Sequence, residues 1–205
     1  MWTGTEFEIN IALIRHGKTE SNEHRKYLSY TDEALSDEGK KQIEANCKGY
    51  PAAQKVYTSS LSRTIETAQI IYGDNIYAIK ELDEINFGDF EGKTYEELQN
   101  NGDYISWLNS NCTCLIPNGE AREDFVKRQL SGLNKILIDA RDYEEIAVVS
   151  HGGTVMSICS HFLGEDYYKY MIANGEYIET RVTYQVSEKL DVFISHFSII
   201  NRNDS

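Results

Sequence analysis

Three short apolar runs in the chain are predicted to be buried strands. Residues 9–14 alternate and then become almost fully apolar, residues 55–59 form a shorter run, and residues 146–150 are apolar up to a final serine. Runs of this length and composition are typical of strands covered on both faces of a sheet. If the three strands are parallel, their carboxyl ends meet at one edge, where open α/β sheets bind ligands.

Helical patterns separate the predicted strands. The spacing of apolar residues indicates helices over about 36–47, 61–72, 120–140 and 154–163. Ser36 is a suitable N-cap followed by two acidic residues, and Gly73 is a suitable stop. The stretch Thr94–Glu97 is a capping box that starts a further short helix.

Short strands are also predicted at 76–79 and, by alternation, at 180–186 and 192–198. The last two are consistent with a hairpin or with two edge strands. Strands that alternate with helices indicate an α/β fold. We therefore expect a three-layer α/β/α sandwich with a mostly parallel central sheet.

The segment 99–118 interrupts this order, because it shows neither helical nor strand spacing and ends near Pro117. We interpret it as an insertion, either a lid over a pocket at the sheet edge or a surface loop without a role. A length of 205 residues suits one domain over 1–205 that carries this insertion.

Composition narrows the class of protein. The formal net charge is −13, which disfavours nucleic acid and anionic membrane surfaces as partners. Neither a basic leader nor a membrane-length apolar run is present, so we expect a cytoplasmic protein with reduced thiols. Cys112 and Cys114 are the only close cysteine pair and lack neighbouring third and fourth ligands, which disfavours zinc.

Cationic or proton-carrying residues follow each of the three buried strands. Arg15-His16-Gly17 follows the first, Arg63 comes within one turn after the second, and His151 follows the third directly. Arginine forks bind phosphate oxygens in a planar, bidentate manner. Two arginines and two histidines converging at one edge therefore predict a pocket for a dianionic phosphoryl group on a small-molecule phosphate ester.

Four stretches of the chain resemble the motifs of the histidine phosphatase superfamily, the phosphoglycerate-mutase-like enzymes. A lone Arg-His-Gly recurs by chance, but four motifs in the order of the family are specific. The stretches are Leu13–Asn22, Ser59–Ala68, Glu84–Gly92 and Ser150–Thr154.

The resemblance implies a phosphohistidine mechanism in which His16 is the nucleophile. A neutral imidazole attacks phosphorus when its other nitrogen donates to an acceptor, here the carbonyl of Gly17. This chemistry requires neither a metal nor a cofactor. The other implied residues are Arg15, Arg63 and His151 on the phosphoryl oxygens, and Asn22, Thr19 and Gly152 in the pocket.

Glu84 is the expected general acid, because the leaving alkoxide needs a proton and a carboxyl beside a phosphate has a raised pKa. Glu81, Asp83 and Glu91 lie nearby and could serve on charge alone, but Glu84 fits the family motif. His24 lies in the loop after the first motif and could reach a substrate.

Several motif details favour a phosphomonoester hydrolase, and the most similar branch is that of the α-ribazole-5′-phosphate phosphatases of cobalamin biosynthesis. The last motif reads His151-Gly152-Gly153, whereas cofactor-dependent phosphoglycerate mutases usually have Asn after the glycine. Ala121 and Thr64 depart from the α-ribazole pattern. A broad-specificity sugar-phosphate phosphatase, a phosphoglycerate mutase and a non-catalytic phospho-ligand binder are the alternatives, and the oligomeric state stays open.

Overall fold

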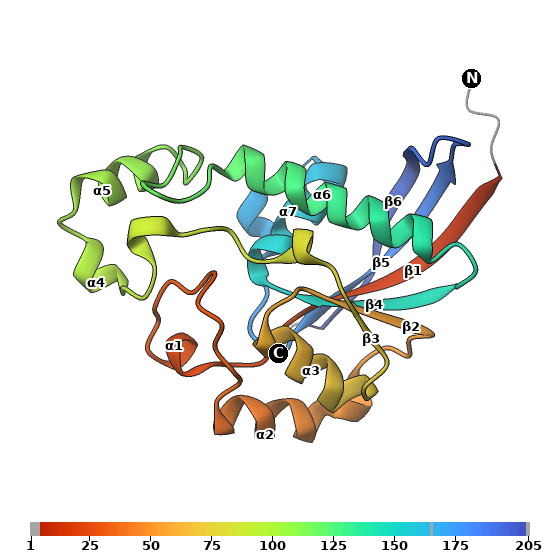
Figure 1. Ribbon diagram of the computed structural model, residues 1–205, viewed down its shortest axis with the longest axis horizontal. Coiled ribbons are helices and arrows are strands. Elements are labelled where there is room, and N and C mark those ends of the chain that lie inside the picture. Colours follow the sequence, from red (N-terminus) through yellow and green to blue (C-terminus); the bar gives the residue numbers. More distant parts are fainter. Residues whose placement is uncertain (1–4, 165, 204–205) are drawn as a thin grey trace.

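The computed structural model describes residues 5–164 and 166–203, which form a mixed α/β fold around one six-stranded sheet (Figure 1). The strand order is β3-β2-β4-β1-β5-β6. Neighbours among the first four strands are parallel, whereas β5 and β6 are antiparallel to their neighbours. The strands are β1 (Glu6–Arg15), β2 (Lys55–Thr58), β3 (Ile76–Ala78), β4 (Glu145–Ser150), β5 (Tyr177–Val186) and β6 (Val192–Asn203).

Helices cover both faces of the sheet, as the apolar strands predict. In Figure 1, α2 (Asp37–Asn46) and α3 (Ser62–Tyr72) lie on one side, and α6 (Arg122–Asp139) and α7 (Gly152–Leu163) on the other. Alternate residues of β1 pack into two different core clusters, Leu13 with residues of α6 and α7, and Ile14 with Ala68 of α3. The three-layer sandwich with a mostly parallel sheet is confirmed.

Local capping signals explain where several helices begin and end. The Ser36 side chain accepts the Gly39 N–H at the start of α2, and Gly73 ends α3 with a positive φ of 85°. At α4 (Tyr95–Leu98), Thr94 and Glu97 form both hydrogen bonds of the capping box. The remaining short elements are α1 (Glu20–Glu23) and the 3₁₀ turns Cys47–Gly49, Lys80–Leu82, Gly88–Phe90 and Tyr167–Tyr170.

The interpretation of 99–118 as a segment without regular structure is wrong in part, because α5 (Gly102–Asn109) lies within it. Tyr104 and Trp107 are three positions apart on this helix and are both buried against Phe90. An eight-residue helix is marginal alone, so this aromatic cluster stabilises it. A stripe of only two aromatic residues is too short to show helical spacing in the sequence.

The C-terminal strands form a hairpin, which decides between the two predicted arrangements. β5 and β6 pair antiparallel through a turn at 187–191, and β5 also pairs with β1 inside the sheet. Within the described ranges, no helix is long and apolar enough to cross a membrane.

Candidate active site

The residues singled out by the sequence meet at the carboxyl ends of β1, β2 and β4. These strands are adjacent and parallel, and Arg15 at the end of β1 pairs in register with Ser150 at the end of β4. The rings of His16 and His151, which follow these residues, have centroids 5.2 Å apart. The parallel pairing thus brings together two motifs that are about 135 positions apart in the chain.

His16 is held as a neutral imidazole with one nitrogen available. Its side chain is nearly fully buried, and Nδ1 donates to the carbonyl of Gly17 at 2.7 Å, which leaves the lone pair on Nε2. Burial lowers the pKa of His16 well below 6.5, and the positive charges of Arg63 and Arg15 lower it further. An unprotonated nitrogen beside two cations is suited to attack on an anionic ester.

His151 is fully buried and lies beside Ser59. Its Nε2 is 2.9 Å from the Ser59 hydroxyl, and its buried Nδ1 has no partner among the described residues. When the hydroxyl donates to Nε2, the proton of the neutral ring is on Nδ1, which is then a free donor. Burial, Arg63 and His16 lower the pKa of His151 well below 6.5, so the ring is neutral.

The two arginines are anchored by backbone carbonyls. Arg63 is fully buried and donates to the carbonyls of Thr31 and Ser29 at 3.1 and 2.7 Å. Arg15 donates to the carbonyl of Ile172 at 2.8 Å. The Nε of each arginine is buried without a partner among the described residues. Buried unpaired cationic donors indicate a site that binds an anion.

Glu84 lies in the loop after β3, with its carboxyl against the start of α7. It accepts the N–H groups of Ile85 at 2.9 Å and Gly153 at 3.2 Å. Burial raises the pKa of Glu84, against the opposing effects of those two N–H groups and of nearby arginines. A Cβ at Gly153 would lie only 2.2 Å from a Glu84 carboxylate oxygen, so any larger residue there would displace that carboxylate.

The other three acidic candidates are engaged elsewhere. Glu91 accepts the N–H groups of Ser29 and Thr31, Asp83 accepts from Ser60, and Glu81 forms an ion pair with Lys135. Among the described residues that line the cavity at the site, Glu84 is the only carboxylate. This supports the choice of Glu84 as general acid.

The remaining sequence candidates are distributed unevenly around the cavity. Asn22 and Gly152 line it, as expected for pocket residues. Thr19 is fully buried, its hydroxyl caps α1 by accepting the Asn22 N–H, and it does not line the cavity. His24 is exposed 4.0 Å from Glu20 and does not line it either. Arg63 and His151 are packed so tightly that they contribute no lining surface.

The cavity has a volume of about 610 Å³, which is far larger than a phosphoryl group. Aromatic and sulfur-containing side chains form part of its walls, and α5 and the residues after it contribute to them. Cys112 lines the cavity as a free thiol, and no cluster of three metal-ligating side chains occurs within the described ranges. The lining side chains include Tyr27, Phe87, Trp107, Arg122 and Tyr167.

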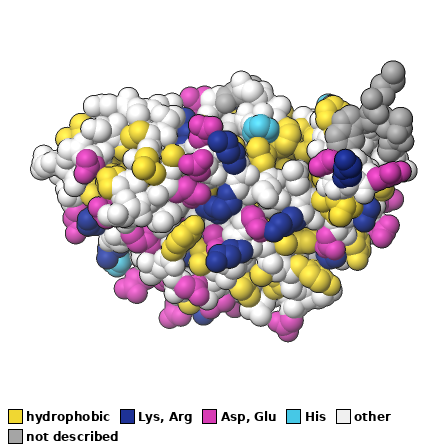
Figure 2. Space-filling view, turned by 45° about the horizontal axis from the view of Figure 1, so that its top comes forward, with side chains coloured by type: hydrophobic (Ala, Val, Ile, Leu, Met, Phe, Trp, Pro, Cys, Tyr) yellow, Lys and Arg dark blue, Asp and Glu magenta, His cyan; other side chains and the backbone are white. Residues whose placement is uncertain are grey.

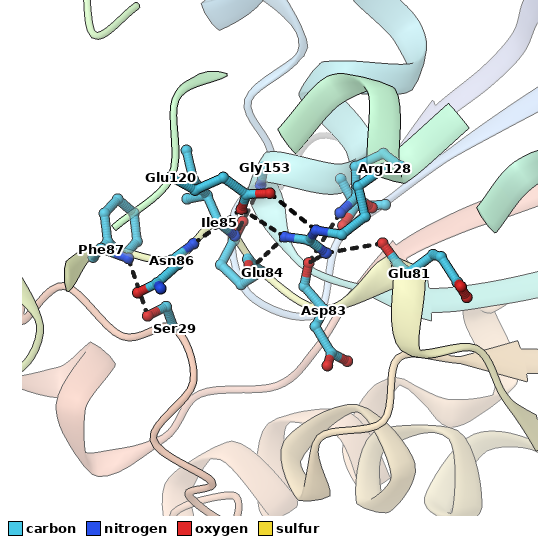
Figure 3. Close-up of polar contacts among 12 residues, drawn as sticks. Ser29, Glu81, Asp83, Glu84, Ile85, Asn86, Phe87, Glu120, Arg128 and Gly153 are labelled. Atoms are coloured by element: carbon cyan, nitrogen blue, oxygen red, sulfur yellow. Dashed lines mark hydrogen bonds and ion pairs between the residues drawn. The ribbon is translucent and has the colours of Figure 1, made fainter. Parts of the chain in front are cut away.

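A network around Arg128 holds the loop that carries Glu84, and sequence reasoning missed it (Figure 3). The Arg128 guanidinium donates to the carbonyls of Glu81, Asp83 and Glu84 at 2.8–3.2 Å. It also forms a forked pair with the Glu120 carboxylate at 3.0 and 2.7 Å. The only sequence signal was an acid and an arginine eight positions apart, which is too common to be informative.

On the face shown in Figure 2, acidic side chains are scattered among basic, apolar and other side chains. The formal net charge of the chain is −13. An anionic ester must therefore be attracted locally. The cations that line the cavity are Arg15, Lys26 and Arg122. They provide a local positive field inside a negatively charged protein.

Comparison with known proteins agrees with this geometry. Residues 11–187 match the model of the histidine phosphatase superfamily, branch 1. The chain is 33% identical over 158 residues to phosphoglycerate mutase-like protein 4 of Arabidopsis thaliana, covering 72% of this chain and 68% of the relative. It is 28% identical over 164 residues to the adenosylcobalamin/alpha-ribazole phosphatase of Escherichia coli K12, covering 76% of this chain and 80% of the relative.

The fold is also shared with solved structures. The structure of Bacillus stearothermophilus YhfR superposes with a TM-score of 0.76 at 24% identity, covering 96% of this chain and 98% of that one. The family match spans most of the chain and contains all four motifs. The chain therefore belongs to the histidine phosphatase superfamily, branch 1.

Proposed function

We propose that the chain hydrolyses a small-molecule phosphomonoester through a phosphohistidine at His16. The observation that carries this proposal is the neutral His16 ring, which is fixed by the Gly17 carbonyl and lies beside two arginines. In the first step, Nε2 forms a bond to phosphorus as the bond to the leaving oxygen breaks. Glu84 gives its proton to that oxygen, and the alcohol departs.

The second step releases phosphate and restores the enzyme. Water attacks the phosphohistidine, its proton passes to the Glu84 carboxylate, and the phosphorus–nitrogen bond breaks. In both steps, Arg15, Arg63 and Nδ1–H of His151 stabilise the charge on the three equatorial oxygens. The side chains of these three residues are already held by protein groups.

One candidate substrate is α-ribazole 5′-phosphate, which the name of the E. coli relative suggests. The aromatic walls of the cavity suit an aromatic leaving group. We place the reaction in the cytoplasm, because all four cysteines are free thiols. A broad-specificity phosphatase and a phosphoglycerate mutase are the competing assignments, the latter suggested by the name of the Arabidopsis relative.

Trapping of the intermediate tests the mechanism. Wild-type enzyme quenched in detergent at alkaline pH during turnover of a ³²P-labelled ester should carry label that acid removes, as expected of phosphohistidine. His16→Ala should lose the label and nearly all turnover while its circular dichroism stays native. His24→Ala is the matched control and should retain both, because His24 is exposed outside the cavity. Full turnover by His16→Ala would exclude the proposed intermediate.

A substrate panel separates the competing assignments. It contains α-ribazole 5′-phosphate, several sugar phosphates and 3-phosphoglycerate, with the products identified by NMR. The proposed phosphohistidine hydrolase releases inorganic phosphate and uses no metal, so a chelator should leave its rate unchanged. Formation of 2-phosphoglycerate without phosphate release would indicate a mutase instead.

A further inference from the structure

Arg122 is a cavity-lining cation that the phosphoryl chemistry does not use. It is the first residue of α6, and its guanidinium lies over the ring of Tyr167, 4.7 Å from the centroid. Its Nη1 is buried and has no hydrogen-bond partner among the described residues. Arg128, less than two turns along the same helix, donates instead to four different residues. The contrast identifies Arg122 as a preorganised donor without a protein acceptor.

Contacts between neighbouring groups locate Arg122 on the leaving-group side of the site. The Glu84 carboxylate accepts the N–H of Gly153 at 3.2 Å, and the Tyr167 hydroxyl donates to the carbonyl of the same glycine at 3.3 Å. The Arg122 guanidinium lies over the ring of this tyrosine, so Gly153 and Tyr167 connect Glu84 to Arg122. Since Glu84 protonates the leaving oxygen, the groups beyond it face the alcohol portion of the ester.

An aromatic wall of the same cavity defines the body of that alcohol. Tyr27 and Phe87 have ring centroids 4.9 Å apart, and Phe87 and Trp107 have centroids 6.4 Å apart. These three rings line the same cavity as Arg122, and the Trp107 Nε1 is likewise buried without a partner among the described residues. Such a wall suits a planar apolar group, with one further acceptor along its edge.

We propose that the preferred substrate is a phosphomonoester whose planar apolar leaving group carries a second anionic group, of the carboxylate class, bound by Arg122. This inference rests on the proposed phosphatase function and deepens it. A forked guanidinium with a free donor pairs well with a carboxylate. Arg122 forms that pair next to the apolar wall, where hydration competes less. α-Ribazole 5′-phosphate has an aromatic base without a second anion, so it matches the wall and not Arg122.

Matched aryl esters test the pairing. The probes are phenyl phosphates with a carboxylate at the meta or para position, each compared with the carboxamide at the same position. Arg122→Gln should reduce kcat/KM for at least one carboxylate ester about 10- to 100-fold more than for its carboxamide partner, as expected when a hydrogen bond to a charged group is lost. The loss in Arg122→Lys should lie between those of the wild type and Arg122→Gln, because lysine keeps the positive charge but cannot form the forked pair.

The comparison of ratios removes differences in leaving-group reactivity, since each ester is compared with itself across variants. Arg141→Gln is the matched control, because this arginine is exposed and donates to the Ile138 carbonyl away from the cavity. It should leave both ester classes unchanged. Equal losses on charged and neutral esters in Arg122→Gln would overturn the assignment of Arg122 while the phosphatase function stands. Absence of labelled phosphohistidine in the wild type would overturn the proposed function itself.

Discussion

Removal of the Arg128 guanidinium should affect both stability and the proton-transfer step. Arg128→Met keeps the aliphatic stem and removes every hydrogen bond that the Arg128 guanidinium donates in Figure 3. The side chains of Arg128 and Glu120 are 22% and 16% exposed. The variant leaves the mostly buried Glu120 carboxylate with only the Asn86 N–H as donor, and it removes one donor from each of three carbonyls, of which that of Asp83 keeps Gln129. We expect a loss of roughly 2–3 kcal/mol, which is the 3–5 kcal/mol of a fully buried pair reduced for partial exposure.

The expected activity change follows from the position of Glu84. Arg128 fixes the carbonyls of residues 81, 83 and 84, so its loss lets the general acid move out of line. The rate on an alkyl phosphate should then fall at least tenfold more than the rate on nitrophenyl phosphate, a part of the ~10²–10⁴ available to general acid catalysis. A merely structural residue would change both rates alike.

Urea unfolding and the ratio of the two ester rates, both measured at pH 7, check this prediction. Lys135→Met is the matched control, because Lys135 is on the same helix and pairs with Glu81 at the surface at 2.6 Å. It should lose less than about 1 kcal/mol and keep the wild-type ratio. An Arg128→Met enzyme that is folded, destabilised and unchanged in its ester ratio would refute the positioning role.

Two further predictions concern Glu84. Glu84→Gln should slow an alkyl phosphate by roughly 10²–10⁴ and nitrophenyl phosphate far less, whereas Arg15→Gln should slow both alike; equal losses for Glu84→Gln would place the acid elsewhere. Because burial raises the pKa of Glu84 above 4.5, the folded state resists its ionisation, and wild-type stability falls as pH rises through that raised value. Glu84→Gln should therefore have a higher Tm than the wild type at pH 8 and a nearly equal one near pH 4, and a pH-independent difference would contradict the shift.

Several features of this protein were determined by short stretches of sequence. The caps Ser36 and Thr94 and the stop Gly73 define helix ends through hydrogen bonds and dihedral angles within a few residues. Apolar runs define strands that are buried on both faces. The convergence of His16 and His151 was also predictable, because parallel strands place their carboxyl ends at one edge.

Tertiary structure decided the features that depend on partners far apart in the chain. The α5 helix exists because Tyr104 and Trp107 pack against Phe90, a contact that no local spacing reveals. Thr19 caps helix α1 and does not line the cavity, although Asn22 of the same motif does. The environment of each side chain in these cases depends on which distant element covers it.

Packing against distant elements also explains why Arg122 and Arg128 have different hydrogen-bond partners. Both are arginines on one helix, and the sequence gives neither a distinguishing signal. The loop carrying Glu84 reaches Arg128 and supplies acceptors for its guanidinium, whereas Arg122 meets the face of Tyr167 and keeps a buried donor free. Sequence determined most of the elements and the convergence of the strand-end residues, while the packing of loops from distant positions decided which charges are paired within the protein and which keep a free donor.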